Sequence, residues 1–290
     1  MTIISEITEK AYAKINLWLE VTGRREDGYH DLVSVMQSVS LHDTVKIAKT
    51  DSGIIEISCT DPMVPSDGRN IAYKAAELFY EMLGTPYNGI KIDIEKRIPS
   101  EAGLGGGSSD GAAVLRGLNK LHGCPFDTDA LRKASKKLGA DVPFCISGKT
   151  MLAEGIGEIL TPIPAITKED GIFFTVCRGG DRMSTPRAFG ELDKISYSNE
   201  SHEGMLHAIS GKNVKGIASE LFNRFETVVP PSKEISHLLR ENGALGVLLS
   251  GSGTALYGLF DSMEKAETAC RAVKEKGVFA CTAYAEAPEL

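Results

Sequence analysis

The segment Ile98–Ala113, with the sequence IPSEAGLGGGSSDGAA, joins an expected strand to an expected helix through a glycine-rich turn. Four glycines fall within residues 103–107, interrupted only by Leu104. Because glycine has no Cβ, backbone N–H groups in this turn can approach a ligand closely. The first N–H groups of the helix are also free, and the helix dipole favours an anion beside them. The turn is therefore a candidate phosphate-binding loop.

Two common phosphate loops do not fit this turn. The Walker A pattern requires G-K-[ST], and no lysine follows the glycines. The G-x-G-x-x-G pattern, started at Gly103 and Gly105, meets Ser108 where its third glycine should stand. A glycine-rich turn can also be purely structural, so these residues alone leave its function open.

Periodicity predicts the elements around the turn. Strands are expected over residues 11–23, 43–50, 53–59 and 89–98. Helices are expected over residues 70–84, 108–123 and 127–139. Asn70 is suited to cap the first of these helices, and Gly84 is suited to end it.

The second half of the chain mixes strands and helices without a strict alternation. Two short apolar segments, 143–147 and 150–154, flank Gly148-Lys149 and indicate a hairpin. Later strands are expected over residues 171–177 and 278–284 and on both sides of a glycine turn within 244–260, and helices over 184–195 and 262–277. The pattern predicts an α+β protein of two domains. Two prolines within residues 161–171 favour a boundary there, giving domains 1–161 and 162–290.

Composition excludes several classes of protein. Of the 290 residues, 42% are hydrophobic and 24% charged, and the net charge of −7 argues against nucleic-acid binding. No apolar run is long enough to span a membrane, and the N-terminus does not resemble a signal peptide. The six cysteines form no C-x-x-C pair, which suggests reduced thiols in a cytoplasmic protein and no metal site built by the protein. We expect a monomer or a weak homodimer.

Three motifs resemble those of the GHMP small-molecule kinase superfamily, which includes galactokinase, homoserine kinase, mevalonate kinase and phosphomevalonate kinase. The string P-x-x-x-G-L-G-G-G-S-S over residues 99–109 resembles its ATP loop, AYAKINLWL over 11–19 its first motif, and LLSGSGTALYG over 248–258 its third. Thr254 departs from the proline that is common in the third motif. AKINLWLEVTGRREDGYHDL, GLGGGSSDGAA and GADVPFC together resemble the branch that phosphorylates 4-(cytidine 5'-diphospho)-2-C-methyl-D-erythritol.

The resemblance implies a fold and an activity. The N-terminal domain would resemble ribosomal protein S5, the C-terminal domain would be ferredoxin-like, and the ligands would lie between them. The activity would be ATP-dependent phosphorylation of the substrate's 2-hydroxyl, in non-mevalonate isoprenoid precursor biosynthesis. Mg²⁺ would arrive with ATP, because it binds mainly through phosphates and few side chains.

The resemblance also assigns catalytic and ATP-binding residues. Asp141 would accept the hydroxyl proton, and Lys14 would compensate its charge. Asp141 follows an expected helix, where the dipole opposes a negative charge. Purely structural roles are the alternative: Lys14 would then be a solvated strand residue, and Asp141 would cap a turn. The implied ATP-binding residues are Pro99, Ser100, Glu101, Ala102, Gly103, Leu104, Gly105, Gly106, Gly107, Ser108, Ser109, Asn70 and Lys96, of which the last two also have good structural roles.

The implied substrate-binding residues are Asn16, Tyr29, His30, Thr185, Phe189, Gly251 and Ser252. In the family, Tyr29 would stack on the cytosine and His30 would read its pairing edge. Phe189 would complete a sandwich around the base. Alternatively, Tyr29 and His30 only pack a turn, and Phe189 is a core residue of an amphipathic helix.

The sequence leaves two alternative functions open. A sister kinase acting on homoserine or a mevalonate-type substrate would need no cytosine sandwich, so Tyr29, His30 and Phe189 distinguish it. An RNA-binding module on an S5-like fold is the other, and the net charge of −7 and the set of phosphate-loop motifs argue against it.

Overall fold

The computed structural model describes residues 5–179, 183–197 and 200–289, which contain a seven-stranded and a four-stranded sheet. The larger sheet has the order β3-β4-β2-β1-β8, with β5 paired to β2 and β6. Its strands are β1 (Glu6–Arg24), β2 (His30–Lys49), β3 (Ile55–Cys59), β4 (Ile90–Glu95), β5 (Thr150–Glu154), β6 (Ile159–Pro162) and β8 (Phe222–Asn223). Four helices accompany it: α1 (Ile71–Leu83), α2 (Gly106–Leu121), α3 (Thr128–Ser135) and α4 (Val142–Ser147).

The smaller sheet has the antiparallel order β11-β7-β10-β9. Its strands are β7 (Phe173–Arg178), β9 (Gly246–Leu249), β10 (Ala255–Phe260) and β11 (Ala280–Tyr284). The associated helices are α5 (Thr185–Leu192), α6 (Glu203–Ser210), α7 (Val214–Ser219), α8 (Lys233–Glu241) and α9 (Met263–Glu275), with short 3₁₀ turns η1 (Lys168–Asp170) and η2 (Arg224–Thr227). Strand, helices, strand, strand, helix, strand is the ferredoxin-like sequence of elements.

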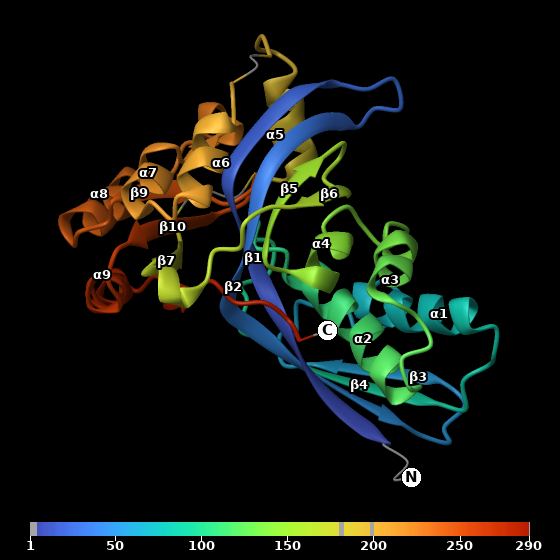
Figure 1. The fold of residues 1–290 in the computed structure, drawn as a ribbon. Helices are drawn as coiled ribbons and strands as arrows, with labels where there is room; N and C mark the ends of the chain where they lie inside the picture. The colour runs from blue at the N-terminus through green and yellow to red at the C-terminus, as the bar shows by residue number, and fades with distance from the viewer. Residues whose placement is uncertain (1–4, 180–182, 198–199, 290) are drawn as a thin grey trace.

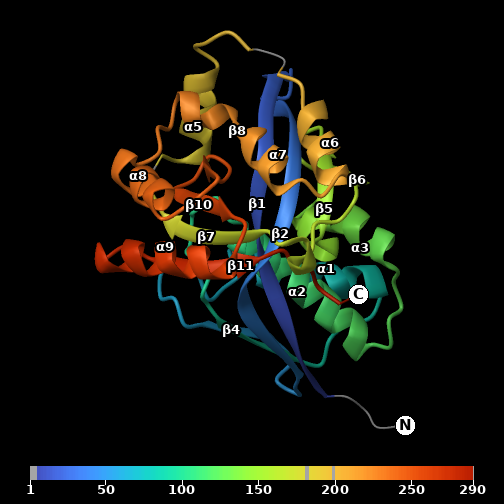
Figure 2. The same cartoon turned by 60° about the vertical axis from the view of Figure 1, so that its left-hand side comes forward.

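The strands β1 and β2 run as a long ribbon between the helices α1–α4 and the smaller sheet (Figure 1, and turned in Figure 2). The strand expected over residues 43–50 is the second half of β2. Apolar side chains of β1 such as Ile15 and Leu17 pack with Phe174 and Tyr257 of the smaller sheet in one core. The Tyr257 hydroxyl donates a hydrogen bond of 2.8 Å to the carbonyl oxygen of Asn16. The smaller sheet is therefore held against β1, the strand that contains the first motif, by apolar packing and by this hydrogen bond.

Two local predictions hold and one is wrong. Helix α1 is capped as expected: Asn70 accepts from the N–H of Ala72, and Gly84 ends the helix in the left-handed conformation. Residues 143–147 form no hairpin strand but lie in α4. Every residue of α4 is buried, so its apolar run shows no polar face, and Pro143 fits the first turn, where its missing N–H costs nothing. Strand β5 pairs instead with β2 and β6.

The division into domains 1–161 and 162–290 stays a prediction. Strand β6 ends at Pro162, close to that boundary, but β8 from the later part of the chain adds to the larger sheet beside β1. None of the helices in the described part of the chain is long and apolar enough to cross a membrane.

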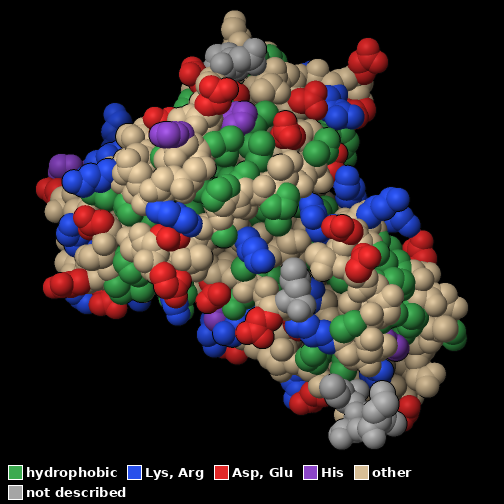
Figure 3. Space-filling model, in the orientation of Figure 1, with side chains coloured by type: hydrophobic (Ala, Val, Ile, Leu, Met, Phe, Trp, Pro, Cys, Tyr) green, Lys and Arg blue, Asp and Glu red, His purple; other side chains and the backbone are tan. Residues whose placement is uncertain are grey.

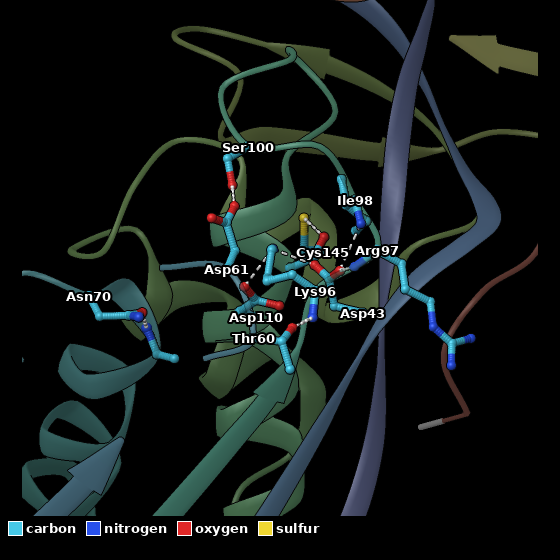
Figure 4. Close-up of polar contacts among 12 residues, drawn as sticks. Asp43, Thr60, Asp61, Asn70, Lys96, Arg97, Ile98, Ser100, Asp110 and Cys145 are labelled. Carbon is cyan, nitrogen blue, oxygen red and sulfur yellow. Dashed lines mark hydrogen bonds and ion pairs between the residues drawn. The ribbon is translucent and has the colours of Figure 1, made fainter. Parts of the chain in front are cut away.

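A buried ionic cluster attaches the glycine-rich loop to the larger sheet (Figure 4). Asp43 of β2 accepts hydrogen bonds from the backbone N–H groups of Arg97 and Ile98, at 2.5 and 2.8 Å, and from the Lys96 ammonium. Lys96 also donates to Asp110 of α2 at 2.9 Å. The cluster thus joins β2, the segment before the loop and the helix after it, so that the loop is held at both ends.

Two glycine loops from distant parts of the chain touch backbone to backbone. The N–H of Ala255 donates to the carbonyl oxygen of Ala102 at 2.9 Å, and the Ser250 hydroxyl donates to that of Gly103 at 3.0 Å. A Cβ on Gly253 would overlap the backbone of Ala102 and Gly103. Only glycine therefore permits this approach.

Replacing Asp110 by Asn should change how stability depends on pH. Burial, with a contribution from the Asp43 carboxylate, raises the pKa of Asp110 from 3.8 to about 7 against the opposing effect of Lys96. The folded protein then holds a proton that the unfolded chain releases, so wild-type stability falls as pH rises from about 4 to about 7. Asp110→Asn lacks this loss. Its unfolding free energy should therefore rise relative to that of wild type over this pH range, by about 1.4 kcal/mol for each unit of the pKa shift.

The measurement is urea unfolding of both proteins at pH 5, 6, 7 and 8. Asp129→Asn is the control, because the Asp129 side chain is 89% exposed, and it should follow wild type. A constant difference between Asp110→Asn and wild type across the pH series would contradict the prediction.

Gly253→Ala should force the two glycine loops apart. We expect a loss of about 1–3 kcal/mol in unfolding free energy, typical of overpacking, together with weaker ATP binding. Gly23→Ala is the matched control, because an added Cβ there meets nothing within 4 Å. Wild-type stability and ATP affinity in Gly253→Ala would show that the loops do not need this contact.

Candidate active site

Two cavities of about 660 and 690 Å³ adjoin the glycine-rich loop. Both are lined by Gly103 and Ser108, so they meet at the loop. The 690 Å³ cavity, here called the loop cavity, is also lined by Asn70, Lys96 and residues 99–107. The 660 Å³ cavity, here called the strand cavity, is lined by all the predicted catalytic and substrate-binding residues: Lys14, Asn16, Tyr29, His30, Asp141, Thr185, Phe189, Gly251 and Ser252.

The loop cavity has the features of an anion site. Helix α2 starts at Gly106, two residues earlier than expected, with Gly105 in the left-handed conformation at its N-cap and no side-chain cap. Its first N–H groups are thus left for a ligand. An added Cβ on Gly105 would lie 3.0 Å from Cγ of Lys14, so the loop also packs against the first motif. A triphosphate fits this donor set.

Four predicted ATP-binding residues make side-chain hydrogen bonds within the protein, and one of them is Ser100, whose hydroxyl donates to Asp61 Oδ2 at 2.8 Å (Figure 4). The Asn70 side chain caps α1 and donates to the carbonyl oxygen of Pro65 at 2.8 Å. The Lys96 ammonium lies between Asp43 and Asp110. Ser109 is buried and donates to the carbonyl oxygen of Tyr12, and it does not line the loop cavity. Asn70 and Lys96 still contribute to the cavity wall.

Lys14, Asn16 and Asp141 lie together in the strand cavity. The Lys14 ammonium donates to Asn16 Oδ1 at 2.9 Å and lies 3.8 Å from Asp141 Oδ2. The Asn16 amide donates to the Ser34 hydroxyl at 2.8 Å, which turns its oxygen towards Lys14. Lys14 is 6% exposed and Asp141 36% exposed, so a nearly buried cation faces a carboxylate that a ligand can reach.

The setting of Asp141 differs from the expectation. The preceding helix α3 ends at Ser135, and Asp141 is the N-cap residue of α4. The dipole of α4 therefore acts with, and not against, its negative charge. The expectation for Asp141 was wrong because the segment after it, residues 143–147, was expected to be a hairpin strand and is a helix.

The turn that follows β1 presents Tyr29. Gly28 adopts a left-handed φ of 86°, and the N–H of Tyr29 donates to Asp27 Oδ1 at 3.0 Å. The Tyr29 side chain is 61% exposed at the cavity wall. The hydrogen-bonded turn thus holds an exposed aromatic ring in a position where it can stack on a ligand.

His30 and Phe189 stack on each other. Their ring centroids lie 4.4 Å apart at an interplanar angle of 19°. Phe189 also meets Phe225 edge-on, with centroids 5.0 Å apart. Phe189 thus contacts His30 and the core at once.

The third motif meets α5 in the same cavity. The hydroxyls of Thr185 and Ser252 lie 2.9 Å apart. The Asn223 amide donates to the carbonyl oxygens of Leu249 and Gly251, at 2.8 Å each, and so fixes the glycine turn.

Sequence reasoning missed three polar residues of the strand cavity: Arg24, Ser34 and Asp193. Ser34 is a polar residue inside an apolar strand, which is a weak signal. Asp193 follows the last turn of α5, where the dipole disfavours an acid and thereby suggests a partner. Nothing in the local sequence singles out Arg24.

Comparisons with known proteins agree with this geometry. The family model described as GHMP kinases N terminal domain matches residues 70–149, and that described as GHMP kinases C terminal matches residues 186–278. The chain is 42% identical over 277 residues to the 4-diphosphocytidyl-2-C-methyl-D-erythritol kinase of Acetivibrio thermocellus, covering 93% of this chain and 96% of that protein. It is 41% identical over 273 residues to the Clostridium botulinum kinase of the same name, with the same coverage.

Solved structures give the same result. A crystal structure of 4-(cytidine 5'-diphospho)-2C-methyl-D-erythritol kinase superposes with a TM-score of 0.79 at 35% identity, covering 97% of this chain and 100% of that one. Homoserine kinase from Cytophaga hutchinsonii superposes with a TM-score of 0.77 at 18% identity, covering 99% and 96%, and shares the fold. The two-domain α+β fold is thus confirmed, and the chain belongs to the GHMP kinases and, within them, to the family of 4-diphosphocytidyl-2-C-methyl-D-erythritol kinases.

Proposed function

We propose that this kinase transfers the γ-phosphoryl group of ATP to the 2-hydroxyl of 4-(cytidine 5'-diphospho)-2-C-methyl-D-erythritol, in non-mevalonate isoprenoid precursor biosynthesis. The names of relatives at about 40% identity support the substrate. The observation that carries the proposal is the junction of the two cavities at Gly103 and Ser108. A triphosphate in the loop cavity would end at this junction, and an alcohol in the strand cavity would meet it there.

The residues beside the junction have complementary roles. The Asp141 carboxylate would accept the proton of the substrate hydroxyl as the oxygen attacks phosphorus. The Lys14 ammonium, 3.8 Å from that carboxylate, would stabilise the charge on the transferring phosphoryl oxygens. Asn16 and Ser34 would hold Lys14 in place through the hydrogen bonds described above. The protein thus contributes position and charge, the main requirements of phosphoryl transfer.

ATP would bring Mg²⁺ with it. Among the described residues there is no group of three or more His, Cys, Asp or Glu side chains suited to a metal ion. Mg²⁺ that arrives with ATP is usually held chiefly by phosphate oxygens and few side chains. The Ser108 hydroxyl, which lines both cavities, is the side chain we propose as its protein ligand. Bound Mg²⁺ would neutralise charge on the phosphates.

The far end of the strand cavity would hold the cytosine. The exposed ring of Tyr29 would stack on the base, and His30 would read its edge. The sandwich of the base between Tyr29 and Phe189 stays a prediction, and the Phe189 ring would also support His30 through their stack. A cytoplasmic location and a monomeric or weakly dimeric state stay predictions.

An ADP-release assay tests the proposal directly. The panel is the cytidine-diphospho substrate, homoserine, mevalonate and no acceptor. ADP release specific to the first compound is expected, whereas turnover of homoserine or mevalonate alone would favour a sister kinase. RNA binding is disfavoured by the net charge of −7 and by the mixed acidic and basic side chains on the face in Figure 3. A filter-binding assay with RNA checks that alternative.

Asp141→Asn should lose most turnover while keeping the fold. A positioned general base contributes about 10²- to 10⁴-fold, and the amide cannot take up the proton. Single-turnover rates measure the loss, and the Kd for ATP and the melting temperature serve as controls because Asp141 makes no side-chain cap bond to α4. A kcat near that of wild type would rule out Asp141 as the base.

Tyr29→Ala should weaken substrate binding selectively. Loss of one stacked ring costs about 1–3 kcal/mol, which corresponds to roughly tenfold to a hundredfold in KM for the cytidine substrate. Tyr29→Phe keeps the ring and should behave like wild type, and neither variant should change the KM for ATP. Steady-state kinetics with each substrate varied in turn measures these effects, and an unchanged KM in Tyr29→Ala would refute stacking.

A further inference from the structure

Asp193 lies directly after α5, at the wall of the strand cavity, and joins three side chains. Its Oδ1 atom lies 2.7 Å from Nε2 of His30 and also accepts a hydrogen bond from the Tyr197 hydroxyl. Its Oδ2 atom lies 3.3 Å from the Arg24 guanidinium. Helix α5 stands beside the end of the β1–β2 ribbon that carries His30 (Figure 1). Asp193 therefore links the two parts of the chain that meet at the predicted base site, as the stack of Phe189 on His30 also does.

These partners keep Asp193 ionised. The hydrogen bond from Tyr197, followed by the one from His30 and the charge of Arg24, lowers the pKa of Asp193 from its usual value. An ionised carboxylate can only accept hydrogen bonds. The proton between the two residues therefore belongs to Nε2 of His30, and in the neutral ring Nδ1 carries the lone pair.

Two contacts fix the orientation of the His30 ring. Asp193 fixes its rotation through Nε2, and the Phe189 stack fixes its plane. Within the described residues, Nδ1 has no hydrogen-bond partner, and His30 lines the strand cavity. A ring held in this way offers the cavity an acceptor of defined direction.

We propose that Asp193 is a positioning residue for base selection: by holding the Nε2 proton of His30 it makes Nδ1 a hydrogen-bond acceptor, which selects a pyrimidine with an exocyclic amine over one with a carbonyl. This inference rests on the proposed function. Cytosine presents an amine donor where uracil presents a carbonyl oxygen. An acceptor facing that oxygen leaves two lone pairs opposed, so the uridine analogue is rejected.

The test compares kcat/KM for the cytidine-diphospho substrate and its uridine-diphospho analogue. In Asp193→Asn the amide can donate to Nε2, which moves the ring proton to Nδ1 and removes the acceptor. The preference for cytidine should fall by about tenfold, the effect of one hydrogen bond, and mainly through KM. Tyr197→Phe is the matched control: it removes another hydrogen bond from Asp193 but leaves Nε2 paired, and the preference should persist.

A second measurement does not depend on activity. The ¹⁵N chemical shifts of the His30 ring in the free protein report which nitrogen carries the proton. Wild type and Tyr197→Phe should show a protonated Nε2 and an unprotonated Nδ1, and Asp193→Asn should shift the proton towards Nδ1. This change would not follow from a merely structural role.

The outcomes separate this inference from the proposed function. An unchanged cytidine preference in Asp193→Asn, or a wild-type His30 protonated on both nitrogens at the assay pH, overturns the role of Asp193 alone. A wild-type enzyme that turns over neither nucleotide substrate overturns the proposed function, and the base selection with it.

Discussion

The contact between the two glycine loops constrains the rest of the molecule. Residues 102–103 and 250–255 approach so closely that a Cβ on Gly253 would overlap the opposite backbone. The hydrogen bond from the N–H of Ala255 to the carbonyl oxygen of Ala102 then attaches the smaller sheet to the loop at the start of α2. Because residues of the first loop line both cavities and the second loop lines the strand cavity, their contact would determine where the ligands meet under the proposed function.

Strand β1 connects the glycine loops to Lys14 and Asn16 of the strand cavity. The N–H of Lys14 donates to the carbonyl oxygen of Leu104 at 2.9 Å, so β1 and the glycine-rich loop share a backbone hydrogen bond. The carbonyl oxygen of Asn16 accepts from Tyr257 of the smaller sheet. Lys14 and Asn16 are thus held from both sides before any ligand binds. A preorganised cation of this kind needs no rearrangement to stabilise charge as it develops.

The two cavities differ in how their polar groups are held. Around the loop cavity, Asp43, Lys96 and Asp110 are buried and bonded to one another, so they fix the loop and leave the first N–H groups of α2 open to a ligand. In the strand cavity, Tyr29 and Asp141 remain open to a ligand. Under the proposed function, the rigid backbone beside ATP would suit a fixed phosphoryl donor, and the reachable side chains beside the acceptor would suit a specific substrate.

The sequence by itself determined the local chemistry: the glycine turn before a helix, the capped helix α1, the alternating strand β1 and the motif residues that resemble the kinase superfamily. Those features are encoded by neighbouring residues, and the structure brings the predicted catalytic and substrate residues to one cavity. Tertiary structure decided the features that the periodicity of apolar residues does not encode. Residues 143–147 are helical, but burial on all sides left their sequence without the polar face that would have shown the helical period, and the unexpected helix reversed the setting of Asp141. The packing of His30 on Phe189 and the link from His30 to Asp193 join residues 159 and 163 positions apart. No local pattern encodes such a pair, because it exists only once α5 has packed beside the β1–β2 ribbon.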